Sequence, residues 1–300
     1  MQVTLIYNSV AGDGAEARRR ALTDLVRRAG HDVRARSAHD ERLAAILDEP
    51  ADVVAVAGGD GTIAHVAQLM QGRETPIAPL PIGTANNIAT ALGLSELSFE
   101  EQISGWTHAE RVLFDVGEAC GPWGSRAVME GFGIGLFPHA MRSPHRHRQP
   151  DASMAHARLA VRTALEELPA VDLIASLDGY DCSGRYVAVE AMNIGLIGPN
   201  LKLCAHADPG DKRLDVVLVS EEHRDLLRDC LLAEEEGHSW PHELLVLRGS
   251  SLSIAPFASG MHIDGEVWPK NGHTWDGAPI EIGFHREGVW FLAARRTLNS

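Results

Sequence analysis

The stretch Asp-Val-Val-Ala-Val-Ala-Gly-Gly-Asp-Gly-Thr-Ile-Ala-His-Val-Ala-Gln, residues 52–68, decides the fold of this chain. Residues 53–57 have the length and the β-branched content of a central strand that is buried on both faces. Glycines 58, 59 and 61 then end the strand, because glycine adopts positive φ and lets a ligand approach the backbone. Thr62 is predicted to cap the helix that follows, whose first N–H groups point back into the turn. This order of strand, glycine turn and helix start predicts a phosphate-binding turn.

Asp60 is the charged residue of this turn. A carboxylate repels phosphate unless a cation lies between them or the acid pairs with a base, so Asp60 indicates Mg²⁺. Short glycine motifs are weak evidence by themselves. A tight βα turn with a polar tip is therefore the alternative.

Residues 77–93 repeat the pattern, with an apolar segment, a Gly83–Thr84 turn and a helix that Gly93 closes. Neighbouring parallel strands present their carboxyl ends at the same edge of a sheet, and ligands of open α/β sheets bind there. The two glycine turns are therefore expected to contribute to one site.

Three motifs in this order resemble the diacylglycerol kinase catalytic-domain family, which includes bacterial lipid kinases and sphingosine kinases. They are Gly-Gly-Asp-Gly-Thr at 58–62, Pro-Ile-Gly-Thr-Ala-Asn-Asn at 81–87 and Asp-Gly-Glu at 264–266. The likeness extends over nearly the whole chain. It implies an α/β N-terminal domain with a parallel sheet, of the NAD kinase and diacylglycerol kinase type, and a mostly antiparallel β-sandwich C-terminal domain.

The same resemblance implies an activity. The expected enzyme is a lipid kinase that uses Mg²⁺ and transfers the γ-phosphoryl group of ATP to a hydroxyl of a lipid-like acceptor, of the diacylglycerol or sphingoid type, in a cleft between the domains. Asp264 is expected to be the catalytic base, positioned by Glu266. The residues expected to bind the nucleotide are Asn8, Gly58, Gly59, Asp60, Gly61, Thr62, Gly83, Thr84 and Asn86.

Departures from the family pattern leave alternatives open. Asp211 and Asp215 match carboxylates that support a structural Mg²⁺ in the family, with Asp60 as the other expected metal ligand, but Lys212 stands where glycine is usual. A salt-bridged turn is the alternative at this point. Asn87 stands where the family usually has Asp, which leaves a non-catalytic nucleotide-binding protein open as an alternative. The related NAD kinases share the first turn and are a further alternative, although residues 83–87 favour the lipid branch.

The pattern of elements predicts two domains, 1–112 and 113–300. The family resemblance implies that the last ~10 residues of the chain return to the first domain. Strands at 3–7 and 33–37, helices near 15–29 and 39–48, and the two glycine-turn units form a βαβαβα series, which predicts a parallel sheet. Strands separated by turns then follow. They are predicted at 111–119, 125–132, 171–178, 185–193, 213–219, 244–247, 251–255, 260–264, 279–284 and 288–293, with helices at 153–168, 200–206 and 222–235.

Composition excludes several classes of protein. The chain carries 27 basic and 41 acidic side chains, a net charge of −14, which argues against nucleic-acid binding and strong attraction to anionic membranes. Four scattered cysteines favour reduced thiols and a cytoplasmic setting. The N-terminal segment lacks the features of a signal peptide, and no apolar run reaches the ~20 residues of a membrane span. Contact with a membrane is expected to be transient and peripheral, at the inner face, and a homodimer is compatible with the sequence.

Two further segments have alternative interpretations. The alternating glycines at 131, 133 and 135 predict a bend or the close approach of another group, and either a substrate contact or plain strand packing explains them. Residues 138–162 hold five arginines and four histidines against a single acid, Asp151. This stretch is either a lip for an anionic lipid or phosphate, or a solvated connection.

Overall fold

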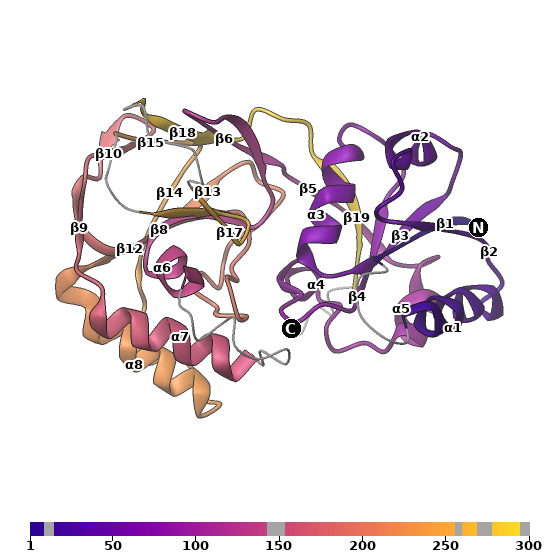
Figure 1. Cartoon of the computed structure of the whole chain (residues 1–300), viewed down its shortest axis with the longest axis horizontal. Coiled ribbons are helices and arrows are strands. Elements are labelled where there is room, and N and C mark those ends of the chain that lie inside the picture. Colours follow the sequence, from indigo (N-terminus) through magenta and orange to yellow (C-terminus); the bar gives the residue numbers. More distant parts are fainter. Residues whose placement is uncertain (9–14, 143–153, 256–259, 269–277, 295–300) are drawn as a thin grey trace. The chain divides into compact units, whose positions relative to one another are not determined.

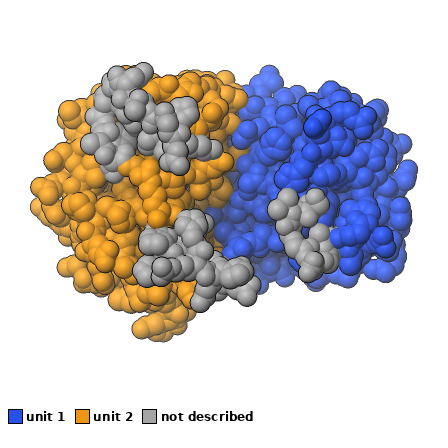
Figure 2. Space-filling view, in the orientation of Figure 1, with its two compact units in different colours: residues 1–116, 287–300 blue, residues 117–286 orange. Residues whose placement is uncertain are grey.

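The computed structural model describes residues 1–8, 15–142, 154–255, 260–268 and 278–294. The chain divides into two compact units, residues 1–116 with 287–300, and residues 117–286 (Figures 1 and 2). The predicted fold class is confirmed, because unit 1 is α/β with a mostly parallel sheet and unit 2 contains antiparallel sheets. The sequence-based boundary at 112 falls within strand β5, Glu110–Phe114, in the sheet of unit 1.

Unit 1 contains a six-stranded sheet in the order β2-β1-β3-β4-β19-β5. Neighbouring strands are parallel except for the antiparallel pair of β19 and β5. The last described strand therefore joins the sheet that the first strands build, whereas residues 295–300 lie outside the described residues. The other strands are β1 (Gln2–Tyr7), β2 (Asp32–Ser37), β3 (Val53–Gly58) and β4 (Ile77–Pro81), and β19 is Val289–Ala293.

Helices cover both faces of this sheet. Leu22 and Val26 of α1 and Ile103 of α5 share one hydrophobic core with Ala55 of β3 and other strand residues. Side chains alternate along a strand, so Val54 and Val56 point to the opposite face, where α3 packs on β3 and β4. The helices are α1 (Ala15–Arg28), α2 (Leu43–Leu47), α3 (Asp60–Leu69), α4 (Asn87–Ala91) and α5 (Phe99–Gly105).

Unit 2 contains two antiparallel sheets that share a core. One has the order β11-β10-β15-β18-β6-β7, and the other β14-β13-β12-β8-β16-β17 with β9 paired to β12. Residues of both sheets form one hydrophobic cluster, as the predicted sandwich requires. The strands are β6 (Gly117–Gly121), β7 (Gly124–Val128), β8 (Gly131–Gly135), β9 (Val171–Leu173), β10 (Ala175–Leu177), β11 (Tyr180–Asp181), β12 (Gly184–Met192), β13 (Leu214–Ser220), β14 (Leu245–Gly249), β15 (Ser251–Ile254), β16 (Met261–Ile263), β17 (Glu266–Trp268) and β18 (Ile280–Gly283).

A second core lies on the outer face of the β12 sheet. There, buried side chains of α6, α7 and α8 pack on Val187, Val217 and Val219. The helical elements are α6 (Leu136–Arg142), α7 (Met154–Glu167), η2 (Glu221–His223) and α8 (Arg224–Glu235). The helices predicted at 153–168 and 222–235 are confirmed.

The structure corrects some predicted elements. The predicted helix at 200–206 is wrong, because Asn200 has a left-handed φ of 57° and Leu201 forms a β-bridge with Ile197. The single strand predicted at 111–119 is two strands, β5 and β6, which belong to different units. Helices α5 and α6 were not predicted. The start of α5 was readable from the sequence, because Ser98 and Glu101 form a capping box there.

Candidate active site

The first glycine turn joins β3 to α3 at the carboxyl edge of the unit 1 sheet. Helix α3 begins at Asp60, and the N-cap residue Gly59 has an extended backbone. The predicted capping role of Thr62 is wrong, because Thr62 lies inside the helix and its N–H donates to the Gly59 carbonyl at 2.9 Å. Gly59 has no side chain that could accept the first free N–H groups. The first turn of α3 therefore presents N–H donors of the kind that bind phosphate.

The second glycine turn packs directly against the first. Strands β3 and β4 are parallel neighbours, and the Ile82 N–H donates to the Gly58 carbonyl at 3.1 Å. A Cβ atom added to Gly83 would lie 2.5 Å from the Cα atom of Gly59, so the backbones touch and leave no room for a side chain. The predicted adjacency of the two turns is confirmed.

Asp60 connects the two turns. Its Oδ1 accepts a hydrogen bond from the Ile88 N–H at 2.9 Å, at the start of α4. Burial raises the pKa of Asp60, and the main-chain N–H groups of Ile88, Asn87 and Asn86 oppose that rise. The carboxylate therefore lies at the N-termini of both α3 and α4, where helix dipoles favour a negative charge.

A magnesium ion bound at Asp60 would have few ligands from the protein itself. Among the described residues, no three His, Cys, Asp or Glu side chains gather closely enough to hold a metal. Mg²⁺ in nucleotide sites is commonly held by one or two carboxylates together with phosphate oxygens and water. Asp60 alone is compatible with this kind of site.

Asn86 and Asn8 form hydrogen bonds that hold the two turns in shape. Asn86 has a left-handed φ of 55°, and its side chain bonds both the N–H and the carbonyl of Gly83, at 3.0 and 2.9 Å. Asn8 follows β1 and donates from Nδ2 to Thr62 Oγ1 at 2.9 Å. His39 Nε2 lies 3.1 Å from Asn8 Oδ1, a contact that the sequence analysis missed. The position of His39, just beyond the carboxyl end of β2, was the available signal. Ser9, Val10 and Ala11, which follow Asn8, lie outside the described residues.

In unit 2, Asp264 and Gly265 form the two-residue turn between β16 and β17. Their φ values are 47° and 78°, which matches the hairpin turn that an Asp-Gly pair favours. Asp264 is half-buried, whereas Glu266 is exposed at the first position of β17.

Three main-chain N–H groups hold the Asp264 carboxylate. Oδ2 accepts from Met129 at 2.7 Å, and Oδ1 accepts from Glu130 at 2.8 Å and from Gly131 at 3.0 Å. Burial raises the pKa of Asp264, and these donors act in the opposite direction. The carboxylate thus fixes the hairpin to the segment that enters β8.

The Asp178–Gly179 turn between β10 and β11 has the same design. Its φ values are 51° and 82°, and the Asp178 carboxylate accepts from the N–H groups of Ser250 and Ser251 at about 3 Å. An Asp-Gly hairpin whose carboxylate accepts main-chain hydrogen bonds therefore also occurs in this chain at a turn with no proposed catalytic role. Asp178 consequently provides an internal control for Asp264.

The predicted metal ligands Asp211 and Asp215 lie around Arg248. The Arg248 guanidinium contacts Asp211 directly and lies 3.6 Å from Asp215 Oδ1. This arrangement is the salt-bridged turn that the sequence left as the alternative, with a cationic side chain between the carboxylates. As arranged here, the pair does not fit a metal ion, and a magnesium site at this turn stays a prediction.

Lys212, between these acids, has a left-handed φ of 55°. A residue with a Cβ atom in this region destabilises the folded state by roughly 1–2 kcal/mol, whereas glycine, which has no Cβ atom, avoids this strain. Lys212→Gly is therefore expected to raise the free energy of unfolding by about 0.5–1 kcal/mol, measured from urea unfolding curves. Lys212→Ala is the matched control, because it removes the same side chain but keeps Cβ and should not stabilise. A Gly variant no more stable than the Ala variant would contradict the strain argument.

The described part of the basic stretch is engaged in contacts within unit 2. Arg142 donates to the Trp268 carbonyl at 3.0 Å, Arg158 lies 3.3 Å from Glu234, and Arg162 pairs with Glu235. Residues 143–153 lie outside the described residues. The lip for an anionic lipid therefore stays a prediction that rests on that segment.

The alternating glycines in β8 are explained by strand packing. Gly133 faces the Glu190 carboxylate of β12, and Gly131 faces the Ala191 carbonyl. Plain strand packing, one of the two predicted interpretations, accounts for these contacts.

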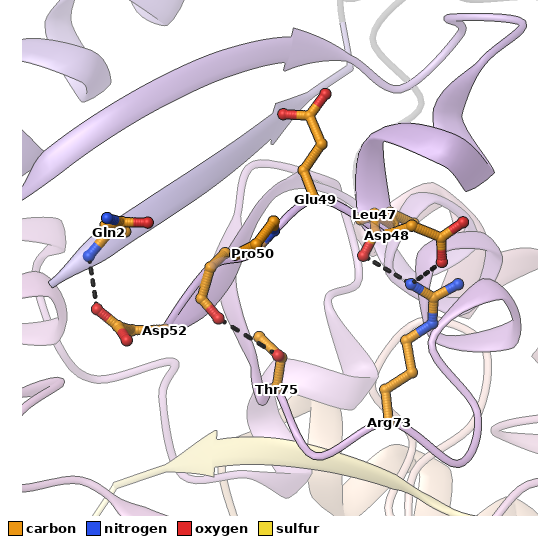
Figure 3. Close-up of a pocket in the computed structure, with 9 residues that line it drawn as sticks. Gln2, Leu47, Asp48, Glu49, Pro50, Asp52, Arg73 and Thr75 are labelled. Atoms are coloured by element: carbon orange, nitrogen blue, oxygen red, sulfur yellow. Dashed lines mark hydrogen bonds and ion pairs between the residues drawn. The ribbon is translucent and has the colours of Figure 1, made fainter.

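A surface depression in unit 1 lies at the amino ends of β1, β3 and β4, away from the glycine turns (Figure 3). Arg73 bonds the Leu47 carbonyl and Asp48 at 2.6 and 2.8 Å, and Asp52 accepts from the Gln2 N–H at 2.7 Å. Its polar groups thus pair with each other. The phosphate-type turns are at the opposite edge of the sheet, so we place the candidate site there.

Comparisons with known proteins agree with the sequence resemblance. Residues 2–119 match the family model of the diacylglycerol kinase catalytic domain. The chain is 26% identical over 282 residues, 88% of each protein, to a diacylglycerol kinase of Mycobacterium tuberculosis. It is 28% identical over 194 residues, 60% of each, to a probable lipid kinase YegS-like protein of Stenotrophomonas maltophilia.

Solved structures support the fold. A diacylglycerol kinase structure from Bacillus anthracis superposes with a TM-score of 0.70 at 18% identity, covering 98% of this chain and 97% of that one. A second solved chain from the same bacterium gives a TM-score of 0.74, also at 18% identity, covering 98% of each chain. The resemblance to the diacylglycerol kinase catalytic-domain family is confirmed.

Proposed function

We propose, from the family resemblance confirmed above, that this protein is an ATP- and Mg²⁺-dependent lipid kinase. It transfers the γ-phosphoryl group to a hydroxyl of a lipid-like acceptor, of the diacylglycerol or sphingoid type. The observation that carries the nucleotide part is the packing of the two glycine turns, with Asp60 bonded across them. One edge of the sheet therefore offers main-chain N–H donors and a carboxylate together.

Phosphoryl transfer needs positioning and charge neutralisation more than covalent help. In the proposal, the N–H groups at the start of α3 and the exposed Gly83–Thr84 turn bind phosphate oxygens. Asp60 orients the cation, and bound Mg²⁺ would neutralise charge on the phosphates. Asn8 and Asn86 keep the turns in shape through the hydrogen bonds described above.

The acceptor hydroxyl loses its proton as the phosphoryl group arrives, and the proposal assigns that proton to Asp264. The carboxylate is available for this role when it is ionised. Because burial raises the pKa of Asp264 above the usual aspartate value of 3.8, the rate is expected to fall as pH drops through this raised pKa. Glu266, exposed beside it, is proposed to help position the acceptor and Asp264.

The acceptor and partners also belong to the proposal. A cleft between the domains as the acceptor site stays a prediction, as do peripheral membrane contact, a cytoplasmic location and a homodimer. In the described part of the chain, no helix has the length and apolar character to span a membrane. The net charge of −14 disfavours nucleic acid as a partner.

A direct transfer assay tests the proposal. The protein is incubated with γ-labelled ATP, Mg²⁺ and, separately, diacylglycerols, sphingoid bases, other lipid alcohols and NAD. Label on a lipid is the expected result, and label on NAD would favour the NAD kinase alternative. ATP binding without transfer to any acceptor would favour a non-catalytic nucleotide-binding protein. An Asp60→Asn preparation, purified in parallel, controls for contaminating kinases.

A further inference from the structure

Unit 2 contains a buried ionisable pair that the proposed mechanism does not use. His262 Nε2 of β16 lies 2.8 Å from Glu190 Oε2 of β12, and the two side chains are only 2% and 1% exposed. This distance lies in the range of a charge-assisted hydrogen bond. A carboxylate is rarely buried to this degree unless it is paired, so the pair calls for an explanation.

The pair forms across three strands. Glu190 of β12 and His262 of β16 both lie opposite Gly133 of the central strand β8. A Cβ atom on Gly133 would lie 2.0 Å from Glu190 Oε2, so only glycine lets the carboxylate reach over β8. Glu190 therefore ties β16, a strand of three residues, to the middle of the sheet.

Asp264 directly follows this strand, as the first residue of the turn between β16 and β17. The Asp264 N–H donates to the Gly131 carbonyl at 3.0 Å and so extends the pairing of β16 with β8. Gly131 also donates to the Asp264 carboxylate. Asp264 therefore follows β16, and one of its donors, Gly131, belongs to β8. These are the two strands that the Glu190–His262 contact keeps in register.

Other charged groups near this face do not replace the pair. Val189 and Ala191 point into the sandwich core, so Glu190 points to the face covered by α6. The ionisable side chains on the elements around this face fall into two groups. On α6 and the strands they are His139, Arg142, Asp172, Asp215, Asp264 and Glu266. On the outer helices they are Glu221, Glu222 and His223 of η2, and Arg158 and Arg162 of α7 with their partners Glu234 and Glu235 of α8. Burial raises the pKa of Glu190, and His262 is the group that opposes this rise.

We propose that Glu190 and His262 form a positioning pair for Asp264: the contact between their side chains keeps β16 in register with β8 and so holds the Asp264 carboxylate on its three main-chain donors. The inference rests on the proposed function only where it treats Asp264 as the catalytic base.

Titration of the Asp264 carboxyl group tests the pair without any assay of activity. The full-length protein, labelled with ¹³C at aspartate carboxyl groups, is titrated by NMR as wild type, Glu190→Gln and His262→Gln. Glu190→Gln replaces the carboxylate of the contact with an amide, and His262→Gln removes the ring that reaches it, so each variant weakens the hold of β8 on Asp264. Both variants should raise the pKa of Asp264 by about 1 unit.

Val189→Ala is the matched control, because it leaves a cavity on the opposite face of β12 and lowers stability without touching the pair. It should leave the Asp264 titration unchanged. If one single variant fails to fold, the other single variant carries the test. An unshifted Asp264 carboxyl group in any folded variant of the pair overturns the inference.

The pH dependence of kcat gives a second readout. In Glu190→Gln and His262→Gln, the acidic limb should move to higher pH by the same amount as the NMR titration, while Val189→Ala keeps the wild-type limb. A wild-type protein without turnover refutes the proposed function but leaves the NMR test valid. Turnover with an unshifted limb and an unshifted titration refutes the pair and leaves the proposed function standing.

Discussion

Asp60→Asn is expected to lower kcat for phosphoryl transfer by at least about 10³-fold while the protein stays folded. Asparagine keeps an Oδ1 atom that can accept the Ile88 N–H, which in the wild type donates at 2.9 Å. What it removes is the negative charge proposed to orient Mg²⁺ beside the phosphates. Steady-state kinetics at saturating ATP and Mg²⁺, with thermal unfolding measured in parallel, checks both parts of this expectation.

Two further variants separate the metal role of Asp60 from its hydrogen bond. Asp60→Ala loses both and should also lower the free energy of unfolding by roughly 1–3 kcal/mol, because the Ile88 N–H loses its partner. Asp60→Cys should recover more activity with Mn²⁺ than with Mg²⁺, because a thiolate prefers the softer metal. Glu100→Gln, an exposed acid in the first turn of α5, controls for loss of charge at a helix start and should keep wild-type rates. Wild-type turnover in Asp60→Asn would refute the assignment.

Asp264→Asn is expected to lower kcat by about 10²–10⁴-fold with little change in ATP affinity, because it removes the proposed base and keeps the shape of the side chain. The amide cannot accept all three main-chain hydrogen bonds that the carboxylate accepts. A stability cost of roughly 1–3 kcal/mol is therefore expected as well. Activity and stability must be measured on the same preparation.

Asp178→Asn is the matched control for this change. Asp178 occupies the same position in the same kind of Asp-Gly hairpin, with its carboxylate on the N–H groups of Ser250 and Ser251. It should lose a similar free energy of unfolding and keep its kcat. Equal kcat in the two variants would reduce Asp264 to a structural turn residue, and collapse of ATP binding in Asp264→Asn would move it to the nucleotide site.

The two glycine turns were predictable because their information is local. An apolar run of β-branched residues followed by glycines specifies a strand and its end within about ten residues, and two such units in succession specify parallel neighbours. The adjacency of Gly59 and Gly83 follows from that topology. The predicted N-cap, Thr62, lies three residues beyond the observed one, Gly59, because the preference of residue types for capping positions does not show which residue of a glycine turn becomes the N-cap.

Contacts between distant segments were not predictable in the same way. Arg248 lies 37 residues from Asp211, so the local sequence left a magnesium site and a salt-bridged turn both open, and only the fold supplies the partner of the turn. The helix predicted at 200–206 failed because Asn200 takes a left-handed conformation in a turn closed by the Ile197–Leu201 bridge. In both cases a partner outside the local window decided the outcome.

The sequence by itself determined the fold class, the order of the strands around the glycine turns and the identity of the candidate residues, because these depend on short patterns of apolar, glycine and acidic residues. Only the tertiary structure decided which carboxylates are held by which donors. Asp60 bridges two helix starts, Asp264 lies on the N–H groups of residues 129–131, and Glu190 meets His262 over Gly133. Each of these contacts joins segments 28 to 135 residues apart, and the pairing of strands and helices that brings them together is a property of the folded chain.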